Sequence, residues 1–325
     1  MKKSLRKPLR ILSLYERLSR GDLVRKQELA DEFGVDPKTI YYDIRDLRAY
    51  LSELDSTSRD VTFDRKKQGY LIERDCDNWL EETEVLALAK VLLESRAFTK
   101  EETKKLLDKL IMQSSPESRK TIKDLIANEL IHYVPLENAQ PLIEKIWDLC
   151  GAIHRQQIVE IIYNKVGAEK PVKRNIKPLS VIFSEYYFYL LAAMEDREFA
   201  FPTIYRLDRI IDYTITDRKY KVIYAERFEE GIFRKQVQFM QSGELRKVKF
   251  RFWGESIEAI LDRLPTARIL SQEGDIYTVE AEVFGRGILM WLLSQGPTVE
   301  ILAPAELRSE MMEKISAMSR IYNRT

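Results

Sequence analysis

The chain has 325 residues, of which 45% are hydrophobic and 32% are charged, and its formal net charge at pH 7 is +1. This length allows two or three hydrophobic cores, and no apolar run is long enough to span a membrane. Because an amphipathic helix, not an apolar secretion signal, follows the basic N-terminus, we expect a cytoplasmic protein. Cys76 and Cys150 lie far apart without metal-ligand spacing, which indicates free thiols. The near-zero net charge does not exclude DNA binding, since only the charge of the contacting face matters.

The N-terminal residues predict three helices. Apolar residues recur at helical spacing over 9–18, and a second helix is predicted over 26–33, ending at Gly34. Asp36 is placed to cap a third helix, with Pro37 at its first position. Two helices joined by a short glycine-containing turn are the signature of a helix-turn-helix, although all-helical proteins of other function also contain this pattern.

The third helix has two different faces. Ile40, Ile44 and Leu47 fall on one stripe at about 100° per residue and are expected to face the core. Arginine offers a bidentate fork to guanine, and tyrosine and threonine offer hydroxyls to phosphates or bases. The residues that point away from the core or flank it are therefore candidates for DNA contact: Lys38, Thr39, Tyr41, Tyr42 and Arg45.

A basic hairpin is predicted after this helix. The segments 61–64 and 69–72 have the composition of two short strands around a basic turn. Such a wing can contact backbone phosphate beside the groove, and its candidate residues are Arg65, Lys66 and Lys67. The basic residues at the start of the chain form either a phosphate-contacting arm or a solvated tail: Lys2, Lys3, Arg6, Lys7 and Arg10.

Apolar residues recur at helical spacing over 80–134, which predicts helices interrupted at Ser114–Pro116. One more helix is predicted over 142–153. Their apolar faces serve either as a packed linker or as an interface with a second copy of the chain. A regulator that binds a two-fold symmetric operator needs such an interface.

Two strand-rich regions follow. Strands are predicted over 158–163, 174–182, 187–194, 199–206 and 213–215, and five short strands suit a small closed barrel. Beyond residue 245 the prediction is strand, helix, strand, strand, helix and strand, followed by a final helix from Pro304 to about Tyr322. This order is typical of a ferredoxin-like domain.

Several strings in these regions resemble a known family. Phe188-Tyr189-Leu190 is similar to the tripeptide that names the WYL domain, with Phe in place of Trp, and the string 206–210, Arg-Leu-Asp-Arg-Ile, is a stronger match. The strings 291–296 and 304–308 resemble the WCX extension of WYL proteins, and roughly residues 8–73 resemble a DeoR-like winged helix-turn-helix. The resemblance implies a homodimeric bacterial transcription regulator, with a Sm-like barrel that senses a nucleotide, a short nucleic-acid strand or a similar metabolite.

The expected fold is therefore an α+β multidomain chain. We predict a winged helix-turn-helix over 1–75, a helical linker or dimerisation region over 76–154, the Sm-like WYL barrel over 155–228, and a ferredoxin-like WCX domain over 240–325.

The candidate effector ligands are arginine and tyrosine side chains of the barrel. By strand alternation Tyr189 points away from Phe188 and Leu190, toward a pocket. Arg206 and Arg209 have opposite parity unless a bulge intervenes, so at most one is expected to face the ligand, and Arg174 is a weaker candidate. Structural pairing of these arginines with Asp208 or Asp212 is the alternative.

No motif indicates catalysis. The two histidines, His132 and His154, have no second ligand at metal spacing, and there is no glycine-rich phosphate loop. We expect a non-enzymatic regulator without cofactor that binds a double-stranded operator, an inverted repeat, and an anionic effector. The alternative is an accessory regulator of a phage-defence or DNA-damage system that binds single-stranded DNA or RNA through the barrel.

Overall fold

The computed structural model describes residues 5–19, 21–54, 61–72, 80–195, 202–221, 228–237, 239–241 and 243–323. The chain divides into two compact units, residues 1–136 and 137–325. No helix in these ranges is both long enough and apolar enough to cross a membrane. The domain boundaries predicted at 75, 154 and 228 stay predictions.

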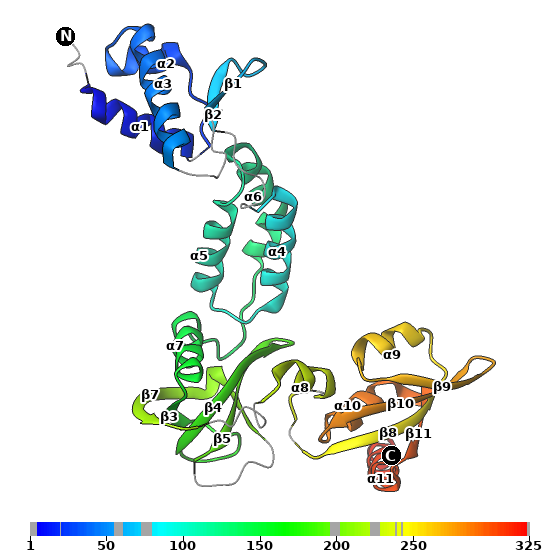
Figure 1. Cartoon of the computed structure of the whole chain (residues 1–325). Helices are drawn as coiled ribbons and strands as arrows, with labels where there is room; N and C mark the ends of the chain where they lie inside the picture. Colours follow the sequence, from blue (N-terminus) through cyan, green and yellow to red (C-terminus); the bar gives the residue numbers. More distant parts are fainter. Residues whose placement is uncertain are drawn as a thin grey trace. The chain divides into compact units, whose positions relative to one another are not determined.

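The first unit begins with three helices and a hairpin, at the residues where the sequence predicts them (Figure 1). Gly34 ends the second helix with φ 65°, a left-handed conformation that glycine adopts without strain, and Asp36 Oδ1 accepts the Lys38 N–H at 2.7 Å. One core joins the helices to the hairpin, through Leu14, Ile44 and Val61 among others. The elements are α1 (Lys7–Ser19), α2 (Lys26–Phe33), α3 (Pro37–Leu54), β1 (Val61–Asp64) and β2 (Gly69–Ile72).

Three further helices complete this unit, α4 (Glu82–Ser95), α5 (Lys100–Ile111) and α6 (Pro116–Ile131). The break between α4 and α5 was not predicted. It forms because Arg96 takes a left-handed conformation, φ 51°, and Thr99 with Glu102 forms a capping box at the start of α5. The three helices share a core of their own.

The second unit begins with α7 (Ile143–His154), which packs on the strands β3 (Gln157–Tyr163) and β4 (Val172–Ser184). The remaining strands of this sheet are β5 (Tyr187–Met194), β6 (Thr203–Arg206) and β7 (Ile210–Lys219), and the 3-10 turn η2 (Leu207–Arg209) joins the last two. The hydrogen-bonded order is β6-β5-β4-β3-β7, antiparallel throughout. Since β6 and β7 are the two ends of this order, closure of the sheet into a barrel stays a prediction.

A short helix that the sequence did not predict, α8 (Glu230–Gln236), follows this sheet. Its Phe233 packs with Ile182 and Leu191 of the sheet and approaches Phe284 of the next domain, with ring centroids 5.7 Å apart. Ser180 donates a 2.6 Å hydrogen bond to the Glu230 carboxylate, which attaches the start of α8 to β4.

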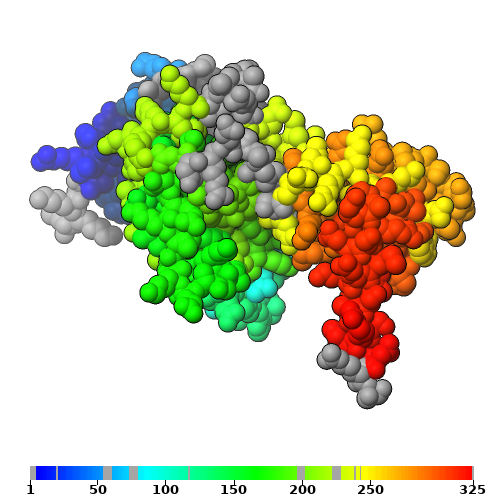
Figure 2. All heavy atoms as spheres, turned by 90° about the horizontal axis from the view of Figure 1, so that it is seen from below, coloured from blue at the N-terminus to red at the C-terminus, as the bar shows by residue number. Residues whose placement is uncertain are grey.

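The C-terminal elements follow one another in the predicted order of strands and helices. They are β8 (Leu245–Phe252), α9 (Ile257–Arg263), β9 (Arg268–Glu273), β10 (Ile276–Phe284), α10 (Gly287–Ser294), the 3-10 turn η4 (Gly296–Thr298), β11 (Val299–Ala303) and α11 (Ala305–Tyr322). The sheet is antiparallel in the order β11-β8-β10-β9. The N-terminal half of α11 packs on this domain through its buried residues Leu307 and Met311. The C-terminal half extends away from the domain with apolar side chains exposed (Figure 2).

Candidate nucleic-acid interface and effector site

The helix α3 buries one face and exposes the other. Ile40, Ile44 and Leu47 are at most 1% exposed, which confirms their predicted orientation. Lys38, Tyr41, Tyr42 and Arg45 are exposed, and Thr39 is half-buried. The five candidate residues therefore lie on the surface that the core leaves open.

Arg45 is held near this surface by weak contacts. Its guanidinium carbon lies 5.1 Å from the centroid of the Tyr42 ring, and Nη2 lies 3.4 Å from Asp46 Oδ1. Asp46 also binds Lys7 at 2.7 Å, and the Lys7 hydrogen bond, reinforced by Arg45, lowers the pKa of the Asp46 carboxyl. Because Arg45 stays 63% exposed, its fork can exchange these contacts for a base or a phosphate.

Lys26 of α2 is a further cation beside α3. Its Nζ lies 5.9 Å from the Tyr41 ring centroid and 5.8 Å from that of Tyr70 on the hairpin. This position depends on how α2, α3 and β2 pack, so no local pattern indicated it.

The hairpin presents its basic turn to solvent. Arg65, Lys66 and Lys67 are exposed. Asp64 Oδ1 accepts the backbone N–H groups of Lys66 and Lys67 at 2.7 and 3.0 Å. These two bonds, of which the one from Lys67 has the larger effect, lower the pKa of the Asp64 carboxyl and order the turn.

Two cations of the basic run at the start of the chain are paired with carboxylates of α3. Arg10 is buried in a bidentate pair with Asp43 of α3, at 2.7 and 3.2 Å, so it belongs neither to an arm nor to a tail. Lys7 is paired with Asp46, and Lys2 and Lys3 lie outside the described residues.

A cluster of rings and charges occupies one face of the second unit's first sheet. Tyr189 of β5 is the register partner of Arg206 of β6. The Arg206 guanidinium carbon lies 3.5 Å from the centroid of the Tyr187 ring, and Nε and Nη2 donate to the Asp208 carboxylate at 3.0 and 2.5 Å. We call Tyr187, Tyr189 and Arg206 the sheet-face cluster. Tyr187 was missed, although strand alternation places it on the same face as Tyr189.

Burial and charge set the pKa values of Tyr189 and Arg206. Burial raises the pKa of Tyr189 to about 12, even though the charge of Arg206 acts in the opposite direction. Burial by itself lowers the pKa of Arg206, but the hydrogen bonds and charge of Asp208 outweigh it and the pKa is raised. The cluster therefore presents a neutral phenol beside a permanent cation. The pairing with Asp208 that the sequence left open is present.

The other two candidate arginines lie elsewhere. Arg209 is the last residue of the turn η2, whereas Arg206 is the last residue of β6. Arg174 is exposed on β4 opposite Ile161, whereas the β4 partner of Tyr189 is Ile182. The structure brings together Tyr189 and Arg206 and does not bring Arg174 to them.

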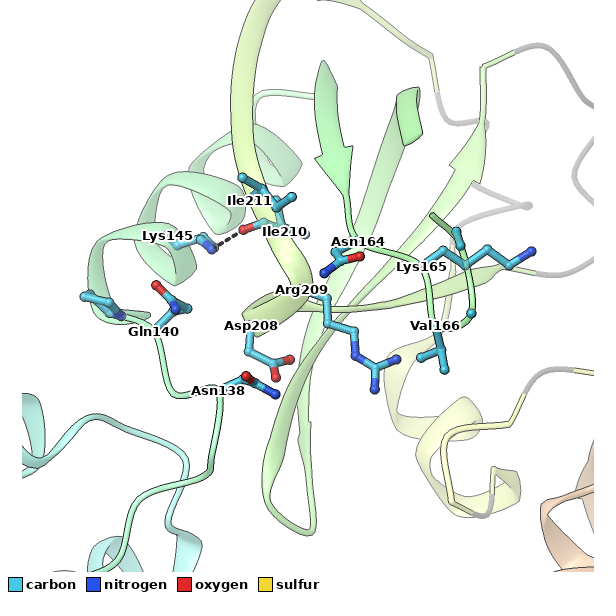
Figure 3. Close-up of a pocket in the computed structure, with 13 residues that line it drawn as sticks. Asn138, Gln140, Lys145, Asn164, Lys165, Val166, Asp208, Arg209, Ile210 and Ile211 are labelled. Carbon is cyan, nitrogen blue, oxygen red and sulfur yellow. Dashed lines mark hydrogen bonds between the residues drawn. The ribbon is translucent and has the colours of Figure 1, made fainter. Parts of the chain in front are cut away.

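Arg209 lines a cavity of about 680 Å³ (Figure 3). Lys145 of α7 forms part of its wall and donates to the carbonyl oxygens of Leu207 and Ile210 at 3.1 and 2.7 Å. Burial lowers the pKa of Lys145, opposed by Asp208 and Asp212. The lining residues are Asn138, Gln140, Pro141, Lys145, Asn164, Lys165, Val166, Gly167, Ala168, Asp208, Arg209, Ile210 and Ile211.

The described residues contain no group of three or more His, Cys, Asp or Glu side chains arranged to hold a metal ion. The sheet-face cluster and the cavity offer guanidinium, phenol and amide groups, which suit recognition of anions.

Comparison with known families matches two parts of the chain. The WYL domain model matches residues 144–215, and the WCX domain model matches residues 244–319. The chain contains a WYL domain followed by a WCX domain. The WYL match takes in nearly all of α7 and the sheet as far as the middle of β7, and it includes both the sheet-face cluster and most of the cavity.

Two solved structures are similar to this WYL-domain protein at low identity. One is proteasome accessory factor B/C (PafBC) of Arthrobacter aurescens, with 19% identity, a TM-score of 0.32, and coverage of 99% of this chain and 49% of that chain. The other is a CRISPR Cas-related protein, with 16% identity, a TM-score of 0.38, and coverage of 85% and 76%. The chain thus spans about half the length of PafBC. No curated protein matches the sequence.

Proposed function

We propose that this WYL-domain protein is a DNA-binding transcriptional regulator. In this proposal a winged helix-turn-helix contacts an inverted-repeat operator as part of a cytoplasmic homodimer, and the WYL domain binds an anionic, nucleotide-like or nucleic-acid-like effector. The observation that carries it is the stacking of the Arg206 guanidinium on the Tyr187 ring, 3.5 Å from its centroid, beside the register partner of Arg206, Tyr189. We assign a Sm-like barrel to the first sheet of this unit and a ferredoxin-like arrangement to the second, and we infer a binding protein rather than an enzyme.

The DNA-binding part of the proposal is supported by the open face of α3. An exposed guanidinium and two exposed phenols lie opposite the buried stripe, beside Lys26 and the basic hairpin turn. Side chains of this kind, on a helix that only one face anchors, suit the major groove.

The effector part is supported by the sheet-face cluster. Arginine on an aromatic face retains donors for phosphate or carboxylate, and a neighbouring phenol adds a donor and a ring for stacking. Two of the Arg206 nitrogens point to Asp208, which fixes the plane of the guanidinium before a ligand arrives.

Apolar surface supports the dimer. Leu88 and Val91 of α4 and Leu125 of α6 are exposed, as are Met312 and Ile315 of α11. Val91→Glu and Ile315→Glu test the two surfaces separately by light scattering. We expect one of them to lower the mass from about twice 38.3 kDa to 38.3 kDa and to weaken operator binding. A wild-type mass of 38.3 kDa at micromolar concentration, with tight operator binding, would contradict the dimer.

Anisotropy titration against operator DNA, found by genome-wide binding-site mapping, tests the DNA interface. Arg45→Ala should cost about 1 to 3 kcal/mol of specific binding. Lys66→Ala should weaken binding to every sequence and reduce the salt slope by about one. Lys104→Ala, an exposed lysine of α5, is the control and should change neither. Wild-type affinity of Arg45→Ala for the operator would refute the assignment.

Titration of the full chain with a short single-stranded oligonucleotide and with AMP tests the effector site. Tyr187→Leu and Tyr189→Phe should weaken effector binding while leaving operator affinity unchanged without effector. Tyr213→Phe is the matched control, because that phenol lies on β7 and donates to Asp148 at 2.7 Å. Equal binding by all three variants would place the effector elsewhere.

The second candidate is an accessory regulator of a phage-defence or DNA-damage system. The same guanidinium and ring platform favours it, since stacking on exposed rings tolerates any base sequence. The oligonucleotide titration distinguishes the two. Single strands that bind without changing operator affinity indicate the accessory role, whereas single strands that change it indicate an effector.

A further inference from the structure

The cavity beside η2 is separate from the sheet-face cluster. Arg206 lies on the sheet face, whereas Arg209, three residues later, lines the cavity formed by α7, the segment before it and the β3–β4 turn. None of the three residues of the sheet-face cluster lines this cavity. The two arginines of one short sequence string therefore serve different surfaces.

Among the described residues that line the cavity, one cation is available to a ligand. Lys145 is committed to two carbonyl oxygens, and the ammonium of Lys165 points away from the cavity in Figure 3. The Arg209 side chain extends between Asp208 and Val166, and within the described part of the chain it forms no ion pair. An anionic group would bind there, because the guanidinium fork matches carboxylate and phosphate oxygens.

The rest of the wall suits hydroxyl groups. The Asp208 carboxylate is held by Arg206, and its side chain is only 6% exposed. A carboxylate has about four acceptor positions, so it can still accept from a hydroxyl. The amides of Asn138, Gln140 and Asn164 line the same space and provide both donors and acceptors.

The wall also argues against a nucleobase. None of the 13 described lining residues carries an aromatic ring, whereas bases are usually held by stacking. The volume of about 680 Å³ lies within the range of small-molecule sites. We infer that this cavity binds a small hydroxylated anion without a base, either a phosphate ester or a hydroxycarboxylate.

Asp208 links this site to the sheet-face cluster. Its carboxylate accepts from Arg206 on one side and lines the cavity on the other. A hydroxyl that donates to Asp208 would share this carboxylate with Arg206, so the cavity and the guanidinium on the sheet face would be coupled through one side chain. The cavity site does not depend on the sheet-face cluster being an effector site.

Isothermal titration of the full chain with glycerol 3-phosphate and with citrate tests the inference. One of the two should bind, and which one binds distinguishes a phosphate ester from a hydroxycarboxylate. Arg209→Gln should weaken that binding by about 10- to 100-fold, as expected when a hydrogen-bonded charge is lost. Asn138→Ala should weaken it less. The control, Lys170→Gln, removes an exposed cation of the same β3–β4 loop outside the lining and should leave binding unchanged.

Three results would overturn the inference. If neither probe binds at about 10 mM, a concentration far above the dissociation constant of a specific site, the cavity is not a binding site. Binding that Arg209→Gln leaves intact would place the ligand elsewhere, provided thermal melts show the variant folded. Tighter binding of AMP than of either probe, lost in Arg209→Gln, would show that the site accepts a base.

Discussion

The ion pair between Arg10 and Asp43 predicts a large effect of removing one charge. The side chains are 8% and 1% exposed, and the fork is completed by a 2.6 Å bond from Arg10 Nη1 to the Leu5 carbonyl oxygen. Asp43→Asn keeps the shape of the side chain but leaves a buried guanidinium without a counter-charge. We expect this to lower the free energy of unfolding of the N-terminal helices by about 3 kcal/mol.

The same region contains a matched control. Arg17 and Glu32 form a bidentate pair of similar geometry, at 2.9 and 2.5 Å, but they are 36% and 48% exposed. Glu32→Gln should cost less than about 1 kcal/mol, because water solvates the charge that remains. Comparison of the two variants separates burial from hydrogen-bond geometry.

Hydrogen exchange of peptides from α1 and α3 is the assay, since it reports the opening of this region without requiring the whole chain to unfold in one step. A loss of about 3 kcal/mol accelerates exchange about 150-fold for amides that exchange through this opening. The double variant Arg10→Met/Asp43→Leu should recover most of the stability, because apolar side chains replace buried ion pairs at little cost. An equal loss of stability in Asp43→Asn and Glu32→Gln, or a double variant as unstable as Asp43→Asn, would show that burial of the pair is not the cause.

Two further predictions concern the second unit. Gly243→Ala should destabilise the WCX domain by about 1 to 3 kcal/mol, because the new Cβ would lie 2.5 Å from the backbone Cα of Gly285. Gly274 has φ +59° and open space around it. Gly274→Ala should therefore lose less stability in thermal melts, namely the cost of a left-handed backbone in alanine. Equal losses in the two variants would refute the steric argument. Burial raises the pKa of Tyr189 and of Tyr220 to about 12, above the ordinary value of 10.0. The stability that their neutral forms contribute is therefore complete below pH 10 and is lost as the pH rises toward 12. Tyr189→Phe should flatten the fall in melting temperature over this interval, and an unchanged slope would count against burial as the cause.

Local patterns predicted most of the elements. The bounds of α2, β1 and β2 and the start of α3 agree with the structure, because caps, turn residues and apolar periodicity act within a few residues of one another. The same locality explains why α8 was missed. Its seven residues are anchored by Phe233 and by the Ser180 to Glu230 hydrogen bond, both of which are long-range contacts.

The sequence by itself determined which residue types are present and which face of each helix or strand they occupy. It placed Ile40, Ile44 and Leu47 inside, whereas strand alternation could not orient Arg209, because this residue lies in the turn η2 and not on a strand. Only the tertiary structure decided what each arginine meets: Tyr187 and Asp208 for Arg206, the cavity for Arg209, and Asp43 for Arg10. The physical reason is that periodicity fixes the direction of a side chain relative to its own backbone, whereas its partner is set by the packing of segments that are distant in the chain.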